Sequence, residues 1–139
     1  MKYNEKQFYG ILNSKDANRY KYFIKHCANK KNVWICEATE SIKRKIETEG
    51  ELYIVWTDEV FCKHFFEKCN DERYNNVRNY RILEFYRKVL TGIISQNGYI
   101  LVMPNDKDEG MVISAKELKI DIFKKVWEGE QDEWIFQFQ

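Results

Sequence analysis

The chain has 139 residues, of which 44% are hydrophobic and 16% aromatic, with 23 basic and 22 acidic side chains. That length is typical of one domain over residues 1–139, and abundant aromatic residues with a net charge of +1 exclude a disordered chain. The low counts of 6 glycines and 1 proline also exclude collagen-like and proline-rich chains.

The charge is unevenly distributed along the chain. Residues 1–50 hold 11 Lys/Arg and 6 Asp/Glu, a net charge of +5, and residues 51–139 hold 12 and 16, a net charge of −4. Two outcomes stay open: the two signs form separate surface patches, or they interleave once the chain folds. The small total disfavours nonspecific nucleic-acid binding, which rests on a large basic surface.

Two helices are predicted at the start of the chain. Asn4 and Gln7 have the spacing of a capping box, which predicts a helix over residues 4–13. Ser14 is the expected cap of a second helix that runs to about residue 29. Its apolar residues repeat at helical spacing, at Tyr20, Phe23, Ile24 and Cys27.

Three strands are predicted next, as an antiparallel meander. Residues 33–36 are β-branched and aromatic, as strands favour. Residues 41–47 alternate, with Ile42, Arg44 and Ile46 on one face, and the apolar residues 52–56 follow a turn.

The second half predicts helices and strands in alternation. Thr57 is the expected cap of a helix that runs to Cys69, and residues 70–79 are polar and predict an exposed loop. Residues 80–83 are either a short strand or the entry to a helix, which continues over residues 84–96.

The C-terminal part predicts two strands, a helix and a tail. Residues 99–103 and 111–113 are strand-like, and Ser114 and Glu117 form a capping box for a helix that runs to about residue 128. Residues 130–139 alternate aromatic with other side chains and predict a C-terminal edge strand or tail. The fold class is therefore α+β: a single domain with a five- or six-stranded antiparallel or mixed sheet, flanked by about five helices.

Several separated motifs of the chain occur together in one known family. They are Arg19-Tyr20-Lys21-Tyr22-Phe23-Ile24, Val33-Trp34, Val55-Trp56, Pro104-Asn105, Gly110-Met111-Val112-Ile113-Ser114 and Glu117-Leu118. Over residues 17–125 the chain resembles the bacterial family catalogued as domain of unknown function 2750. A looser likeness links it to the N-terminal domain of the type III secretion enhancer family.

Neither likeness carries a known catalytic residue. The resemblance implies a small bacterial cytoplasmic protein, and related small α+β families often act as immunity or adaptor proteins beside toxins. The residues themselves agree with a cytoplasmic location, because no apolar run resembles a signal peptide or spans a bilayer.

The residue types that usually carry catalysis are sparse. His26 lies at a lysine-rich helix end, where a cation is favourable, and His64 is expected on the solvated face of its helix. His64 and Cys62 are two residues apart, so they point to different faces and do not pair. The cysteines lack zinc spacing, and the acidic turn over residues 105–110 is too short for a calcium loop. We therefore assign no catalytic residue, no metal and no cofactor.

Two aromatic segments stand out as interaction surfaces. Arginine and tyrosine interleave over residues 73–87, and the tail is rich in aromatic residues. These side chains either pack on the protein itself or form a protein interface, since Arg, Tyr and Trp dominate binding hot spots. The predicted partner surface comprises Arg73, Arg78, Tyr80, Arg81, Trp134, Phe136 and Phe138.

The predicted function is a noncatalytic protein-binding module, with an immunity-type role as one form of it. The alternatives are a small enzyme with an unrecognised carboxylate site and an RNA-binding protein. We expect a protein partner, with a homodimer through the C-terminal strand as a further option. Membranes are not expected as partners, and nucleic acid is disfavoured.

Overall fold

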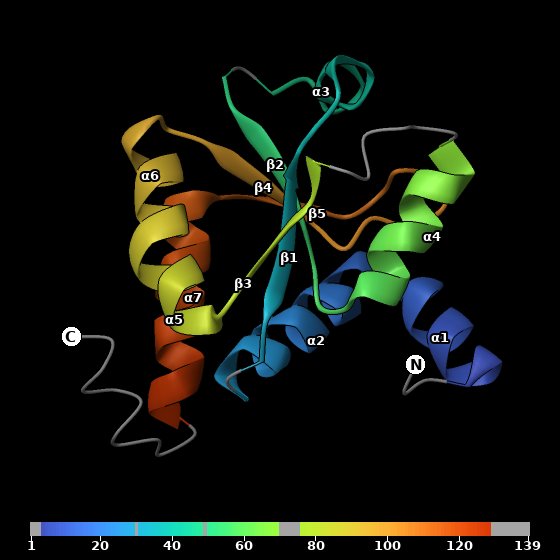
Figure 1. Ribbon diagram of the computed structural model, residues 1–139, viewed down its shortest axis with the longest axis horizontal. Helices are drawn as coiled ribbons and strands as arrows, with labels where there is room; N and C mark the ends of the chain where they lie inside the picture. Colours follow the sequence, from blue (N-terminus) through green and yellow to red (C-terminus); the bar gives the residue numbers. More distant parts are fainter. Residues whose placement is uncertain (1–3, 30, 49, 70–75, 129–139) are drawn as a thin grey trace.

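A computed structural model describes residues 4–29, 31–48, 50–69 and 76–128, and Figure 1 shows how their helices and strands are arranged. In chain order they are α1 (Glu5–Leu12), α2 (Asp16–Ala28), β1 (Val33–Glu37), α3 (Glu40–Ile46), β2 (Leu52–Trp56), α4 (Glu59–Cys69), β3 (Arg78–Tyr80), α5 (Ile82–Glu84), the π-helix η2 (Phe85–Val89), α6 (Leu90–Ser95), β4 (Tyr99–Val102), β5 (Met111–Ser114) and α7 (Ala115–Glu128).

The strands form one five-stranded mixed sheet in the order β3-β1-β2-β4-β5. β1 pairs with both β2 and β3 in antiparallel fashion, β2 pairs with β4 in parallel, and β4 pairs with β5 in antiparallel fashion. The parallel pair requires a long crossover, which the chain makes through α4, β3 and the helices that follow. The predicted α+β class and sheet are thereby confirmed. The predicted tail strand over residues 130–139 lies outside the described residues.

Helices cover the two sides of the sheet. α5, α6 and α7 lie on one side, α1 and α4 lie on the other, and α3 lies at the end of the β1–β2 pair (Figure 1). The core between these layers contains large side chains with almost no exposed area, among them Trp56, Phe61, Phe85, Leu90, Ile100 and Leu101. Most of the chain's described aromatic residues therefore serve packing, as the helix stripes and strand faces predict.

The predicted helix starts are partly right. The capping box of α1 is confirmed: the amide of Gln7 donates to Asn4 Oδ1 at 2.8 Å, and the amide of Asn4 donates to Gln7 Oε1 at 3.1 Å. Ser114 likewise accepts from the amide of Glu117 at 3.1 Å. The predicted cap of α2 is wrong, because the Ser14 hydroxyl donates backward to a carbonyl of α1 and α2 begins one residue later than Ser14 would allow.

The predicted strand over residues 41–47 is wrong, because this segment is helix α3. Ile42 and Ile46 are four residues apart and so share a helix face as readily as alternating residues share a strand face. The Thr39 side chain accepts from the amide of Ile42 at 3.2 Å, and Glu47 ends the helix in the left-handed conformation with φ 61°. The cap at Thr39 and the left-handed Glu47 favour a helix over a strand. Because the segment is a helix, β1 pairs directly with β2.

The predicted cap of α4 is also wrong. The Thr57 hydroxyl is buried and has no hydrogen-bond partner in the part of the chain that the structure describes. The carbonyl of Asp58 accepts instead from the amides of Phe61 and Cys62, so the helix begins one residue later.

Residues 82–95 form one continuous helical segment in which α5, η2 and α6 follow without a break. It includes most of the helix predicted over residues 84–96 but begins earlier, at Ile82, so residues 82 and 83 are the entry to a helix rather than a strand. The predicted loop over residues 70–79 is wrong at Arg78 and Asn79, which form β3 together with Tyr80. The π-helical stretch was not predicted. No helix within the described residues is both long and apolar enough to cross a membrane, and the cytoplasmic location stays a prediction.

Candidate functional site

A groove of about 580 Å³ lies between β3, β1 and β2 on one side and η2 and α6 on the other. We call it the β3 groove. Its sheet wall comes from side chains of three adjacent strands, among them Tyr53, Arg78 and Tyr80, and its helical wall includes Lys88 and Gln96. Residues that are far apart in the chain therefore share one concave surface.

The π-helix shapes the helical wall of the β3 groove. Such stretches insert one residue into an α-helix and are frequent at functional sites. Lys88 and Val89 belong to η2 and line the groove directly, and Phe85 at its start is fully buried in the core. The π-helix thus supplies side chains both to the core and to the groove wall.

Positively charged side chains outnumber negatively charged ones in the described lining of the β3 groove. Its carboxylate, Glu37, lies 3.3 Å from Lys43 Nζ in an ion pair. Burial works to lower the pKa of Lys43, but the hydrogen bond and charge of Glu37, together with the charges of Glu40 and Glu51, raise that pKa overall. Because Lys43 balances Glu37, Arg78 and Lys88 leave the described lining with a surplus of positive charge.

The structure places the predicted partner-surface residues unequally. Arg78 and Tyr80 lie together in the β3 groove. Arg81 is exposed directly after β3, at the start of α5, and is not part of the lining. The other predicted residues lie outside the described residues; they are Arg73, Trp134, Phe136 and Phe138.

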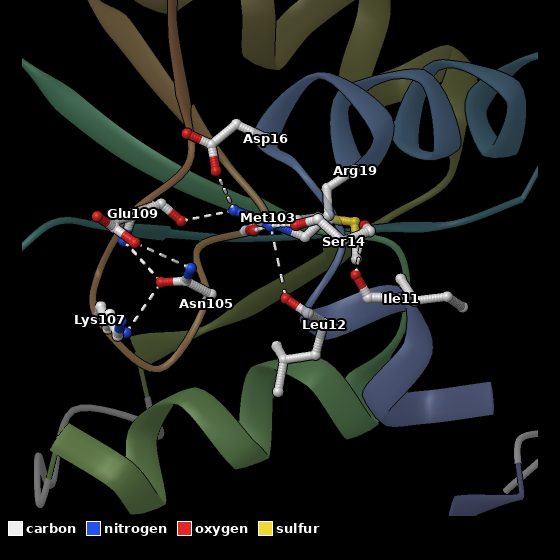
Figure 2. Close-up of polar contacts among 9 residues, drawn as sticks. All are labelled: Ile11, Leu12, Ser14, Asp16, Arg19, Met103, Asn105, Lys107 and Glu109. Carbon is white, nitrogen blue, oxygen red and sulfur yellow. Dashed lines mark hydrogen bonds and ion pairs between the residues drawn. The ribbon is translucent and has the colours of Figure 1, made fainter. Parts of the chain in front are cut away.

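A second polar site surrounds Arg19, which is only 1% exposed (Figure 2). Its Nε donates to the carbonyl of Met103 at 2.7 Å, and its Nη2 donates to the carbonyl of Glu109 at 2.7 Å and to Asp16 Oδ1 at 2.6 Å. Its Nη1 donates to the carbonyl of Ser14. Arg19 therefore fastens the start of α2 to both ends of the loop that joins β4 to β5.

Asn105 organises the same loop from within. Its Oδ1 accepts from the amides of Lys107 at 2.9 Å and Glu109 at 3.0 Å, and its Nδ2 donates to Glu109 Oε1 at 3.2 Å (Figure 2). Lys45 of α3 donates to the carbonyl of Lys107 at 2.7 Å. The acidic segment 105–110 is thus a turn whose polar side chains bind its own backbone and neighbouring cations.

The two sites now have a family context. A family model described as "Protein of unknown function (DUF2750)" matches residues 20–122. The chain belongs to this family. Neither a curated protein nor a solved structure is significantly similar to the chain. The looser likeness to the type III secretion enhancer family is not shown by these comparisons and stays a prediction.

The DUF2750 match runs from α2 to α7 and includes all five strands of the sheet. Two of the family-like motifs lie close together in the structure. Arg19, which begins one motif, donates to the carbonyls of Met103 and Glu109, and Met103 directly precedes the motif Pro104-Asn105.

Both histidines of this DUF2750 protein differ from their predicted settings. His64 is not on a solvated face: its side chain is 13% exposed, and its Nε2 lies 2.7 Å from Asp106 Oδ1. The ring of Phe8 packs edge-on against it at 5.1 Å. His26 is not a favourable cation either, because burial lowers its pKa although its Nε2 donates to the carbonyl of Asn32 at 2.7 Å.

One signal in the sequence indicates the Arg19 site. Arg19 lies four residues before Phe23 and so continues the apolar stripe of α2, where a charged residue indicates a buried cation. The His64–Asp106 contact has no such local signal, since the two residues belong to different elements. Cys27 and Cys62 are buried, and burial raises the pKa of each thiol, so both stay protonated.

The described residues contain no group of three or more His, Cys, Asp or Glu side chains arranged to hold a metal ion. The Arg19 site is fully occupied by its own contacts, whereas the β3 groove is open. The β3 groove is therefore the candidate functional site.

Proposed function

We propose that this DUF2750 protein is a noncatalytic protein-binding module whose partner docks in the β3 groove. The observation that carries the proposal is the convergence of Tyr53, Arg78, Tyr80 and Lys88 on one open groove. Arginine and tyrosine are enriched among residues that dominate binding energy, because they bury a large area and still form hydrogen bonds.

The chemistry of the lining supports binding over acid–base catalysis. Acid–base catalysis by a pair of carboxylates needs two such groups whose environments separate their pKa values. The described lining has one carboxylate, Glu37, and Lys43 already pairs with it. The raised pKa of Tyr53, caused first by burial and then by Glu51 and Glu37, keeps its hydroxyl as a hydrogen-bond donor at neutral pH.

The immunity-type role is the form of this proposal in which the partner is a toxin that the bound protein inactivates. The family resemblance supports this role only indirectly, because related small α+β families often act as immunity proteins beside toxins. It therefore stays a prediction, as does a homodimer through the C-terminal segment.

A photo-crosslinking experiment tests the groove directly. A benzophenone side chain is placed at Tyr80 in the groove or at Tyr99, which is 38% exposed on β4 and does not line it. We expect irradiation in cells to join one discrete protein to the Tyr80 position and not to the Tyr99 position. Adding Arg78→Ala and Lys88→Ala should abolish that product.

The matched control is Arg44→Ala with Lys116→Ala, two exposed cations outside the groove, which should leave the product unchanged. Equal labelling at Tyr80 and Tyr99 would refute the proposal. A substrate turnover lost only in the Arg78→Ala, Lys88→Ala variant would favour the enzyme alternative. Salt-sensitive retention on single-stranded RNA, lost in the same variant, would favour the RNA-binding alternative.

A further inference from the structure

A second groove, of about 370 Å³, lies between α2 and α7 and shares no lining residue with the β3 groove. Four exposed lysines line it, two from each helix: Lys21, Lys25, Lys124 and Lys125. Together with Asp121 these give the lining a formal charge of +3, whereas the whole chain carries +1. The rest of the chain therefore carries a formal net charge of −2.

The floor of the α2–α7 groove is apolar and held in place. Tyr20 and Ile24 of α2 supply it, and Ile24 is only 7% exposed. The Tyr20 hydroxyl donates to Asp121 Oδ2 of α7 at 2.5 Å, which joins the two walls. Burial, and then the Asp121 carboxylate, raise the pKa of Tyr20, so this hydroxyl keeps its proton at physiological pH.

We propose that the α2–α7 groove binds an acidic segment of a partner protein, in which one apolar side chain is flanked by carboxylates. The apolar side chain lies on Tyr20 and Ile24, and the carboxylates lie against the lysines at the rim. Charge complementarity carries this choice, because four lysines and a single carboxylate, Asp121, line the groove. Lysine stems extend the apolar surface while their charged ends stay in water.

The same lysines fit single-stranded nucleic acid less well. Proteins that bind it combine cations with aromatic rings on which successive bases stack. The described lining offers one ring, Tyr20, whose hydroxyl donates to Asp121. Asp121 repels phosphates and carboxylates alike, so the stacking platform decides: single-stranded nucleic acid needs several rings, and an acidic protein segment needs none.

The test measures binding of a short dye-labelled peptide to the full-length protein by fluorescence anisotropy. The peptide has one central phenylalanine flanked on both sides by glutamates. The comparison ligands are the same peptide with glutamines for glutamates, the same peptide with glycine for phenylalanine, and single-stranded oligouridine. Two double variants alter the groove. One combines Lys21→Glu and Lys25→Glu on α2, and the other combines Lys124→Glu and Lys125→Glu on α7. The charge-matched control is Arg44→Glu with Lys68→Glu, two exposed cations outside the groove.

We expect each groove variant to weaken binding of the acidic peptide by about tenfold or more, and the control variant to leave it within about twofold. Rising salt should weaken binding, and both altered peptides should bind less tightly than the parent. Unchanged melting curves will show that the variants are folded.

The proposal is overturned if the acidic peptide does not bind at low salt, or if the control variant weakens binding as much as the groove variants do. Tighter binding of oligouridine than of peptide, lost in both groove variants, would assign the groove to nucleic acid instead. The proposal does not depend on the β3 groove, since the crosslinking test and this test alter different residues.

Discussion

Replacing Arg19 with methionine removes the guanidinium that fastens α2 to the β4–β5 loop but keeps a long unbranched side chain. The change leaves the carbonyls of Ser14, Met103 and Glu109 without the donors that Arg19 supplies. We expect a large loss in the free energy of unfolding, because a buried acceptor without a donor has lost its hydrogen bonds to water and makes none within the protein.

The size of the loss follows from these contacts. Each orphaned buried acceptor costs about 1–3 kcal/mol. The carbonyl of Glu109 keeps the amide of Asn105 as a donor at 2.9 Å, and Ser14 is only half-buried, so water relieves part of the cost there. We therefore expect Arg19→Met to lower the free energy of unfolding by about 2–4 kcal/mol, most of it from the buried carbonyl of Met103. Domains of this kind are stable by about 5–15 kcal/mol, so the loss is a large fraction of the total.

Urea unfolding followed by circular dichroism measures the effect. With an m-value of about 2 kcal/mol per molar urea, a loss of about 3 kcal/mol lowers the midpoint by about 1.5 M. Asp16→Asn is the matched control: the Asp16 side chain is 47% exposed, so removing its ion pair with Arg19 should cost about 1 kcal/mol or less. If Arg19→Met costs less than about 1 kcal/mol, or no more than Asp16→Asn, the carbonyl network does not carry the stability that we assign to it.

Three further predictions concern other contacts. Gly110→Ala should destabilise the protein by about 1–3 kcal/mol, because the new Cβ would lie 2.8 Å from the carbonyl oxygen of Val102. Gly10→Ala is the control and should not destabilise the protein, because nothing lies within 4 Å of its new Cβ. Thermal melting of the two variants measures the difference. Tyr20→Phe should flatten the loss of stability above pH 10: the raised pKa keeps the native phenol protonated while the unfolded chain releases its proton, so the wild type loses stability as pH rises. Urea midpoints at pH 8 and above pH 10 measure this, and equal slopes for both proteins would contradict it. The pKa of His26 is lowered in the native protein, so as pH falls the unfolded chain binds a proton before the native protein does, and the wild type loses stability from pH 7 to pH 5. His26→Gln should make this loss smaller. Urea midpoints at pH 7 and pH 5 measure it.

Local patterns predicted most of the secondary structure. The capping boxes at Asn4 and Ser114, and the apolar segments of β1, β2, β4 and β5, are signals between residues that are close in the chain. Such signals act through backbone geometry, so they survive without knowledge of the tertiary fold. The α3 segment failed because the spacing of Ile42 and Ile46 fits both a helix and a strand, and only its ends decide between them.

The candidate site could be predicted only in part. The interleaved arginines and tyrosines of the sequence include Arg78 and Tyr80, which share the β3 groove. The opposite wall, including Lys88, comes from the π-helix, and no spacing in the sequence indicates a π-helical turn. The wall is also set by how the segment 82–95 packs on the sheet, which depends on contacts between distant elements.

The sequence by itself determined the α+β class, the near-neutral total charge and the apolar stripes that build the core. Tertiary structure alone decided where the charges lie. Lys21 and Lys25 come from the basic N-terminal half, whereas Lys124 and Lys125 come from the acidic remainder, yet the four line one groove. Helix pairing, rather than position along the chain, brings these charges together. Arg19 is likewise buried only because the loop from Met103 to Glu109, more than eighty residues away in the chain, offers its carbonyls.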